Sequence, residues 1–467
     1  MVFSSPIFLF YFLPVVLLAY YLLRKHIVLQ NLILFVSSLL FYFWGEKQYV
    51  IIVLFSIAVN YGFGYLISLS KNDIRKAWIL GIGIVTNLSM LLYFKYFDFF
   101  LSTLLHRPNT HSVHLPLGVS FFTFHGLTYI IDIYRKDAVA AKSPMNVGLY
   151  ILFFPQLIAG PIVRYRDIDQ QLNHREVTNA KVYEGVRRFI IGFAKKICIA
   201  NTLGSVADAI YQLPNSDLST SLAWLASLCY TLQIYFDFSG YSDMAIGLAK
   251  LFGFEFVENF NFPYAARSIQ EFWRKWHISL STFFRDYVYI PLGGNRKGPT
   301  RVYLNLLIVF SLTGLWHGAS WNYIIWGMIH GCFLLFERLG FSKVLDRLPK
   351  WVGHVYAIFV VMIAWVLFRI ESLHRAKEIL YKLFFIDRSS SHAFTPAYYL
   401  HNDVIVMMVL GILLSFPIQK LAEKRFPVQT SHIGKKLVMD GFYILLFLFS
   451  LSILSASTYN PFIYFRF

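Results

Sequence analysis

The stretch YVIIVLFSIAVNYGFGYLISL, from Tyr49 to Leu69, decides the fold class of this chain. Its 21 residues carry no charged side chain, and about 20 mostly apolar residues are enough to cross a bilayer as a helix. Similar stretches recur along almost the whole sequence, with short polar breaks between them. The composition agrees, because 57% of residues are hydrophobic and only 14% are charged, too few to cover a soluble globule of this size.

The apolar stretches predict an all-α, polytopic membrane protein with roughly ten to twelve spans. Breaks at Pro155 and Gly160-Pro161 make one of them discontinuous. The candidate spans are 7–23, 27–44, 49–69, 77–97, 114–134, 145–163, one or two within 201–254, 302–317, 321–336, 351–368, 404–416 and 437–454. No repeat or low-complexity linker divides the chain, so we expect a single membrane domain over residues 1–467, with its core motifs within 114–340.

The formal net charge of +17 would suggest nucleic-acid binding in a soluble protein, but here the bases lie in short loops. Arg24-Lys25, Lys71 to Lys76 and Arg135-Lys136 follow the first, third and fifth apolar segments. The positive-inside rule therefore places these loops in the cytoplasm and the N-terminus outside it. Nucleic acid is not an expected partner, whereas membrane lipid is.

The N-terminal segment and the cysteines carry no processing or disulfide signal. Residues 1–6 have no positive charge and the apolar run after them lacks a small-residue cleavage site, so we expect a retained span. Cys198, Cys229 and Cys332 each lie in apolar surroundings without paired spacing. We expect buried, unpaired thiols and no metal site.

Ionisable residues within apolar segments are the best pointers to function, because burying one in a bilayer costs about 2.5–3.5 kcal/mol on insertion scales. The first such cluster runs from Tyr235 to Asp243 and holds two carboxylates, Asp237 and Asp243, six residues apart. These acids either pair with an embedded arginine or cap a broken helix, or they bind substrate directly. The sequence leaves both alternatives open.

A second cluster lies in an amphipathic block from Tyr264 to Arg301. Its aromatic residues recur at helical spacing, while Arg274, Lys275 and Arg285 fall on other faces, which is typical of a helix lying at the membrane surface. The bases either anchor this helix at the lipid headgroups or bind the phosphates of an anionic acyl donor such as coenzyme A.

The third cluster, Gly314-Leu-Trp316-His317-Gly318-Ala319, places a histidine between two apolar runs. At membrane depth a neutral imidazole is favoured over imidazolium, and a neutral imidazole can accept a proton from a hydroxyl nucleophile. His317 is therefore a candidate general base. A structural hydrogen bond or a proton relay in a transporter are the alternatives.

These motifs resemble the membrane-bound O-acyltransferase superfamily, and within it the bacterial alginate O-acetyltransferase-like branch. The resemblance extends from Met1-Val-Phe-Ser-Ser to the terminal Asn460-Pro-Phe-Ile-Tyr-Phe-Arg-Phe467. It implies a ring of tilted helices, with re-entrant and interfacial helices, around a central tunnel. It also implies a catalytic histidine at His317 and a second site residue at His277, which lies 40 residues earlier.

For this branch the resemblance implies acetyl-coenzyme A as a co-substrate that is not permanently bound, and a location in the bacterial inner membrane. The final acceptor would be a polysaccharide of the alginate, cellulose or peptidoglycan type. Neither a GxSxG nor an HExxH motif occurs, so transfer onto sugar would need an extracytoplasmic partner, of the SGNH-hydrolase type or another acetyl-accepting protein.

Several alternatives remain open from the sequence. A proton-coupled transporter or flippase would also contain embedded acids and histidines, although we find no two corresponding halves. D-alanyl transfer and lipid acylation are the alternatives within the superfamily. We expect His125 and His330, which lie in apolar segments, to be structural or to line the tunnel.

Overall fold

The computed structural model describes residues 1–105, 113–385, 394–418, 433–457 and 459–463. These residues form helices joined by loops, and none of them forms a β-strand, which confirms the all-α prediction. The chain divides into two compact units, the first comprising residues 1–189 and 241–257 and the second residues 190–240 and 258–463. A single membrane domain over the whole chain stays a prediction.

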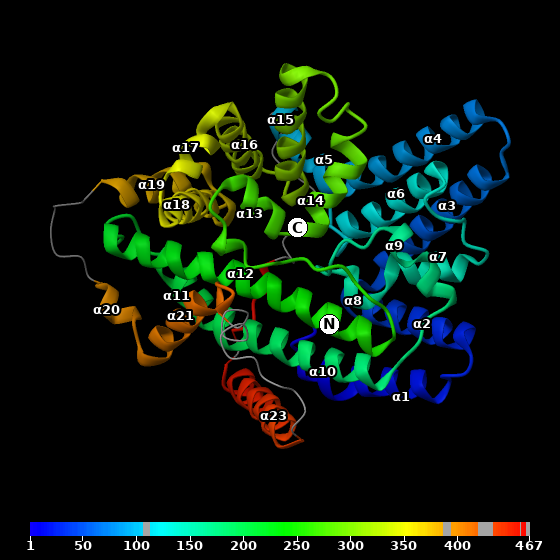
Figure 1. The fold of residues 1–467 in the computed structure, drawn as a ribbon, viewed down its shortest axis with the longest axis horizontal. Helices are drawn as coiled ribbons and strands as arrows, with labels where there is room; N and C mark the ends of the chain where they lie inside the picture. The colour runs from blue at the N-terminus through cyan, green and yellow to red at the C-terminus, as the bar shows by residue number, and fades with distance from the viewer. Residues whose placement is uncertain (106–112, 386–393, 419–432, 458, 464–467) are drawn as a thin grey trace. The chain divides into compact units, whose positions relative to one another are not determined.

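The first unit is built from the N-terminal helices, drawn from blue to teal in Figure 1. Its elements are η1 (Phe8–Phe12), α1 (Leu13–Leu22), α2 (Ile27–Glu46), η2 (Lys47–Tyr49), α3 (Val50–Leu69), α4 (Asp73–Leu91), η3 (Leu92–Tyr96), α5 (Phe97–Leu105), α6 (Val119–Arg135), α7 (Pro144–Leu152), α8 (Phe154–Leu157) and α9 (Tyr165–Asn173). Two further helices, α10 (Asn179–Ala194) and α12 (Thr220–Leu251), contribute residues to both units.

The second unit contains the histidine motifs. Its elements are η4 (Lys195–Ala200), α11 (Asn201–Tyr211), η5 (Pro263–Ala265), α13 (Ile269–Lys275), α14 (Ile278–Phe284), η6 (Arg285–Tyr289), α15 (Gly298–His317), α16 (Trp321–Phe336), η7 (Glu337–Phe341), α17 (Ser342–Arg347), α18 (Lys350–Arg369), α19 (Leu373–Phe384), α20 (Pro396–Tyr399), α21 (Asn402–Leu414) and α23 (Ile433–Ala456). The α15 and α16 helices lie side by side (Figure 1).

Six helical segments of the described chain are long and apolar enough to cross a membrane: Ile27–Leu69, Asp73–Thr103, Asn179–Tyr211, Trp321–Arg347, Lys350–Arg369 and Lys436–Ala456. Two shorter apolar helices occupy Phe8–Leu22 and Asn402–Leu414. Leu54 and Val85, on two of the long segments, are among many large apolar side chains left exposed by the fold, as expected of surfaces that face lipid. The polytopic character is thus confirmed, and the number of spans stays a prediction.

The structure confirms one predicted break in a span and moves one predicted boundary. The segment 145–163 is discontinuous, as its prolines predict, and α7 ends at Leu152 before the short α8 begins at Phe154. By contrast, the apolar helix Asn179–Tyr211 begins well before residue 201, where we expected the next span to start. Lys196 interrupts its apolar pattern, but this lysine is buried and paired with a carboxylate, so the helix continues through it.

The cysteine prediction is wrong at one position. Cys198 and Cys229 are buried, whereas Cys332 is exposed. On α16, Cys332 shares a face with Met328 and Phe336, which are also exposed, and their spacing of four residues is that of one helical stripe. Because that stripe is apolar, the surroundings of Cys332 in the sequence look like a core although the residue lies at the outer surface.

Candidate active site

The position of His317 follows from the close crossing of α15 and α16. A Cβ atom at Gly314 would lie 2.2 Å from the carbonyl oxygen of Tyr323, and one at Gly327 would lie 2.2 Å from the carbonyl oxygen of Phe310. Only glycine lets the two backbones approach this closely, which is a common device in membrane helix pairs. His317 is the last residue of α15, one turn after Gly314, so this crossing positions the imidazole.

Aromatic rings enclose the His317 imidazole, which is only 2% exposed. Its ring centroid lies 4.8 Å from that of Trp316, 5.1 Å from that of Trp326 on α16 and 5.1 Å from that of Phe368 on α18. Such an enclosure excludes bulk water and lowers the local dielectric, so polar interactions made inside it are strong.

The loop after His317 is short, and hydrogen bonds fix it to the neighbouring helices. Ser320 accepts a hydrogen bond from the backbone N–H of Asn322 at 3.3 Å and so caps the start of α16. The buried side-chain amide of Asn322 donates to the carbonyl oxygen of Ile370, just beyond the end of α18. These two contacts hold α15, α16 and α18 together beside His317.

His277 occupies a break between two short helices. We expected one helix across this block, and that prediction is wrong: α13 ends at Lys275, α14 begins at Ile278, and His277 between them has a φ of 43°. This left-handed conformation is uncommon for a residue other than glycine. Trp276 is fully buried rather than anchored at headgroups, because the break turns the aromatic residues of both helices inward.

Asn259 holds the break at His277 in place. The backbone N–H of Ile278 donates to the Asn259 carbonyl oxygen at 3.0 Å, and the Ser279 hydroxyl donates to Asn259 Oδ1 at 2.9 Å. His277 Nδ1 lies 3.1 Å from the same Oδ1. Sequence reasoning missed Asn259, and its only signal is a polar residue in a loop after the long α12 helix.

The hydrogen bond to Asn259 determines which nitrogen of His277 carries the proton. Oδ1 of an amide accepts hydrogen bonds, so Nδ1 of His277 donates and Nε2 holds the lone pair. Burial lowers the pKa of His277 to about 3, which keeps the imidazole neutral near pH 7. Nε2 is buried and has no hydrogen-bond partner among the described residues.

The two histidines predicted to form the site both contact one indole. The ring centroid of Trp316 lies 6.0 Å from that of His277 and 4.8 Å from that of His317. The structure therefore brings together residues that lie 40 positions apart in the sequence. Phe238 of α12 also packs against His277, at 4.6 Å between ring centroids.

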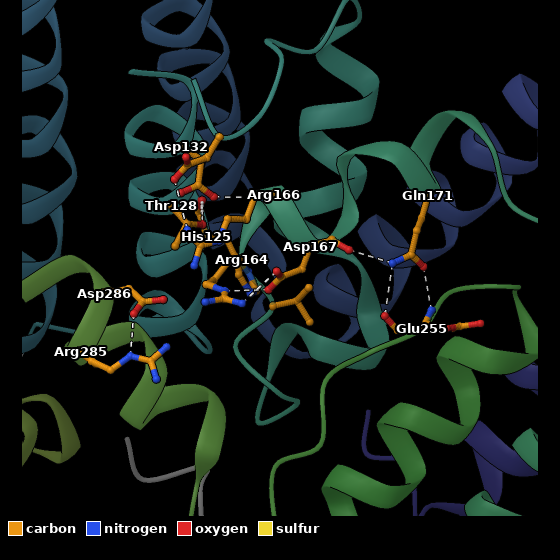
Figure 2. A network of polar contacts seen from close by, with 12 residues as sticks. His125, Thr128, Asp132, Arg164, Arg166, Asp167, Gln171, Glu255, Arg285 and Asp286 are labelled. Carbon is orange, nitrogen blue, oxygen red and sulfur yellow. Dashed lines mark hydrogen bonds and ion pairs between the residues drawn. The ribbon is translucent and has the colours of Figure 1, made fainter. Parts of the chain in front are cut away.

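No contact among the described residues brings together the three bases proposed to bind the donor phosphates. Lys275 Nζ pairs with Glu271 at 2.7 Å, and Arg285 Nε pairs with Asp286 at 2.7 Å (Figure 2). Arg274 is exposed and makes no ion pair within the described chain. Both paired bases would have to exchange a carboxylate for a phosphate to bind the donor.

The two carboxylates of the Tyr235–Asp243 cluster are paired with bases. Asp237 and Lys196 are almost completely buried, and their charged atoms lie 2.7 Å apart. Asp243 accepts from Arg188 Nη2 at 2.8 Å. Of the alternatives for these acids, ion pairing is the one observed, although Asp237 pairs with a lysine and not with an arginine.

A separate polar network belongs to the first unit (Figure 2). Asp132 accepts from the backbone N–H of Arg166 at 3.0 Å, and Arg164 binds Asp167 through Nε at 2.7 Å and Nη2 at 2.9 Å. Gln171 exchanges hydrogen bonds with the backbone of Glu255. These contacts join α6, α9 and the loop after α12, which is a structural role.

Comparison with known proteins identifies the family. The model of the membrane-bound O-acyltransferase family matches residues 38–375. A protein of Pseudomonas putida, probable alginate O-acetylase, is 40% identical with full coverage of both chains. The peptidoglycan O-acetyltransferase of Helicobacter pylori is 37% identical over 81% of this chain and 79% of its own. The chain belongs to the membrane-bound O-acyltransferase family.

A less similar relative is named for transfer of a different acyl group. The teichoic acid D-alanyltransferase of Bacillus subtilis is 32% identical over 52% of this chain and 65% of its own. As a membrane-bound O-acyltransferase, the chain is an enzyme that transfers an acyl group to oxygen, and the resemblance stated from the motifs is confirmed. The histidine enclosure described above lies within the matched residues.

Proposed function

We propose that this acyltransferase passes an acetyl group from acetyl-coenzyme A in the cytoplasm towards hydroxyls of an extracytoplasmic polysaccharide, with His317 as the catalytic base. The observation that carries the proposal is the buried His317 imidazole, enclosed by Trp316, Trp326 and Phe368. Relatives named for acetyl transfer to alginate and peptidoglycan support a polysaccharide acceptor.

The proposed reaction has a balanced course. His317 takes the proton of the acceptor hydroxyl as the oxygen attacks the thioester carbonyl carbon. The carbon–sulfur bond then breaks, an ester remains on the acceptor, and the imidazolium returns the proton to the leaving sulfur. Coenzyme A leaves as the free thiol. A water-poor enclosure favours this transfer over hydrolysis of the thioester.

His277 is proposed as the second site residue. With Nδ1 held by Asn259, its Nε2 lone pair faces a buried region and can accept a hydrogen bond from the acceptor hydroxyl or share its proton. The strained left-handed backbone at His277 supports a functional role, because such conformations cost about 1–3 kcal/mol and cluster at active sites.

The remaining assignments rest on the family resemblance and on charge. Arg274, Lys275 and Arg285 are proposed to attract the phosphates of acetyl-coenzyme A, and Arg274 and Arg285 are exposed. The family resemblance supports a location in the bacterial inner membrane, and the basic loops support an N-terminus outside the cytoplasm. An extracytoplasmic partner of the SGNH-hydrolase type or another acetyl-accepting protein would complete the transfer onto sugar.

The experiment that tests this proposal uses the purified full-length protein in nanodiscs, supplemented with an extract of the extracytoplasmic proteins of the source bacterium, which supplies the acetyl-accepting partner. Radiolabelled acetyl-coenzyme A is supplied on the cytoplasmic face and label is followed onto oligosaccharides derived from alginate or peptidoglycan. Transfer by the wild type and its loss in His317→Ala are expected. Label transfer from D-alanyl donors in place of acetyl donors would instead indicate the teichoic-acid type of reaction.

A further inference from the structure

A polar cavity lies in the second unit at the end of the α15 and α16 pair that is away from the Gly318–Ser320 loop. Its volume is about 370 Å³, within the range of sites that bind small molecules. Polar groups come from Gln270, Asn295, Glu337, Arg338 and Ser342, and Leu306 and Leu334 provide an apolar side. None of these residues belongs to the histidine enclosure.

The charges around this cavity indicate the side of the membrane on which it opens. Six bases flank the two helices at this end, whereas the Gly318–Ser320 loop at the other end carries no charge. These bases are Arg296, Lys297, Arg301, Arg338, Lys343 and Arg347. Because basic residues concentrate in short cytoplasmic loops, the cavity opens towards the cytoplasm, where a soluble acyl donor is found.

The side chains of the cavity fit an anion. Arg338 is exposed, and the one side-chain hydrogen bond that it makes within the described chain is a long one of 3.3 Å from Nη2 to Asn295 Oδ1. The neighbouring Glu337 accepts from the backbone N–H groups of Ile269 and Gln270 at 2.5 and 3.0 Å. Because Glu337 is engaged with backbone amides, Arg338 keeps its guanidinium for a ligand, and a guanidinium binds phosphates through paired, charge-assisted hydrogen bonds.

The distance from the cavity to His317 fits the length of a coenzyme A arm. Leu306 of the cavity and His317 are 11 residues apart on α15, which corresponds to about 16 Å along the helix. The arm between the phosphates and the sulfur is about as long as four to five extended residues, or roughly 15 Å. A donor with its phosphates at Arg338 would therefore hold its thioester near His317.

Polar atoms without partners lie between the cavity and His317. Both ring nitrogens of His330 and Nε1 of Trp273 and Trp326 are buried and have no hydrogen-bond partner among the described residues. The ring centroid of His330 lies 5.2 Å from that of Trp273 and 5.1 Å from that of Trp326, which itself contacts His317. Unsatisfied buried polar atoms cost about 1–3 kcal/mol each, so a ligand or water that supplies partners is expected here.

We propose that the cavity at Arg338 and Asn295 binds the phosphate-bearing head of the acyl donor, and that His330, Trp273 and Trp326 hydrogen-bond the two amides of its arm. This inference rests on the proposed coenzyme A donor and adds a binding site that the sequence did not indicate. It assigns the phosphates to Arg338 in place of the three bases named above, because Lys275 and Arg285 are held by carboxylates and Arg274 does not line the cavity. Water alone at His330 is the competing occupant.

Binding measurements on the full-length protein in phosphatidylcholine nanodiscs test the head site. Coenzyme A and adenosine 3′,5′-bisphosphate are the probes, and Arg338→Ala is expected to raise both Kd values by about 10- to 100-fold, as for the loss of a charge-assisted contact. Arg347→Ala is the matched control, because it removes the same charge at the same end but does not line the cavity. Pantetheine, which lacks phosphates, should bind both variants equally.

The arm is tested with His330→Phe, which keeps an aromatic ring in place and removes both nitrogens. It should weaken pantetheine binding and leave adenosine bisphosphate binding unchanged. Unchanged pantetheine binding would indicate water alone at His330 and overturn this part. Equal losses of coenzyme A affinity in Arg338→Ala and Arg347→Ala would overturn the head site. Binding of phosphatidylglycerol at Arg338 that leaves the affinity for coenzyme A unchanged would overturn it as well.

The design separates this inference from the proposed function. His317→Ala should bind coenzyme A normally while losing transfer. If the wild type transfers acetyl groups from acetyl-coenzyme A but Arg338→Ala binds it normally, only the cavity assignment fails. If the wild type does not bind coenzyme A at all, the proposed donor fails as well.

Discussion

The imidazole of His277 donates from Nδ1 to Oδ1 of Asn259 across 3.1 Å. This contact fixes the neutral tautomer with its lone pair on Nε2, so Asn259 is a positioning residue for a group that lies beside the Trp316 and His317 pair. The same oxygen accepts from the Ser279 hydroxyl, which holds the amide in this orientation.

Replacing Asn259 by aspartate should move the acidic limb of the pH–rate profile to higher pH. A carboxylate next to Nδ1 favours the imidazolium, so the pKa of His277 rises from its burial-lowered value and the neutral form is reached only at higher pH. The profile of kcat/KM against pH measures the shift. Asn261→Asp, on an exposed residue two positions later, is the control, and equal profiles for the two variants would argue against the role of Asn259.

Alanine at Gly314 or Gly327 should destabilise the protein. The added Cβ atom would lie 2.2 Å from a backbone carbonyl oxygen of the facing helix, so α15 and α16 must separate, at a cost of about 1–3 kcal/mol or more. The melting temperature of the detergent-solubilised protein reports the loss. Gly331→Ala is the matched control, because its Cβ would meet only side chains, at 3.3 Å or more. Equal stability of all three variants would contradict the close crossing.

Breaking the buried ion pair of Lys196 and Asp237 should be costly. Lys196→Met leaves a buried carboxylate without its base, which typically costs about 3–5 kcal/mol, and the yield of folded protein on size-exclusion chromatography should fall. Adding Asp237→Asn should recover much of that yield, since no buried charge remains. Lys343→Met, at an exposed lysine, should have no effect. A Lys196→Met protein that folds as well as the wild type would show that the ion pair is dispensable.

The sequence predicts the fold class, which the structure confirms, and singles out His317 as the proposed principal site residue, because both inferences depend on local patterns. Uncharged stretches such as Tyr49–Leu69 indicate spans without knowledge of their neighbours, and His317 is conspicuous between two apolar runs. The span that begins at Asn179 was missed because Lys196 breaks the pattern, and only the distant Asp237 makes that lysine tolerable in a buried helix.

Tertiary contacts explain what sequence reasoning could not find. The break at His277 depends on Asn259, which is 18 residues away and supplies the hydrogen bonds that continuous helices would have made internally. The polar cavity combines Gln270, Asn295 and Arg338 from three elements, and no spacing in the sequence links them. The outward position of Cys332 likewise depends on the side of α16 that is left uncovered.

The central claim is that His317 transfers the proton, and His317→Asn tests it most directly. Asparagine keeps hydrogen bonding but cannot accept a proton near pH 7, and general acid–base catalysis is typically worth about 10²–10⁴-fold. The measurement is the acetyl transfer rate of the purified protein in nanodiscs, supplied with the same extract of extracytoplasmic proteins and the oligosaccharide acceptor, with the Kd for coenzyme A determined on the nanodiscs alone. We predict a loss of that order in kcat with an unchanged Kd. Near-normal transfer by a well-folded His317→Asn protein would contradict the account.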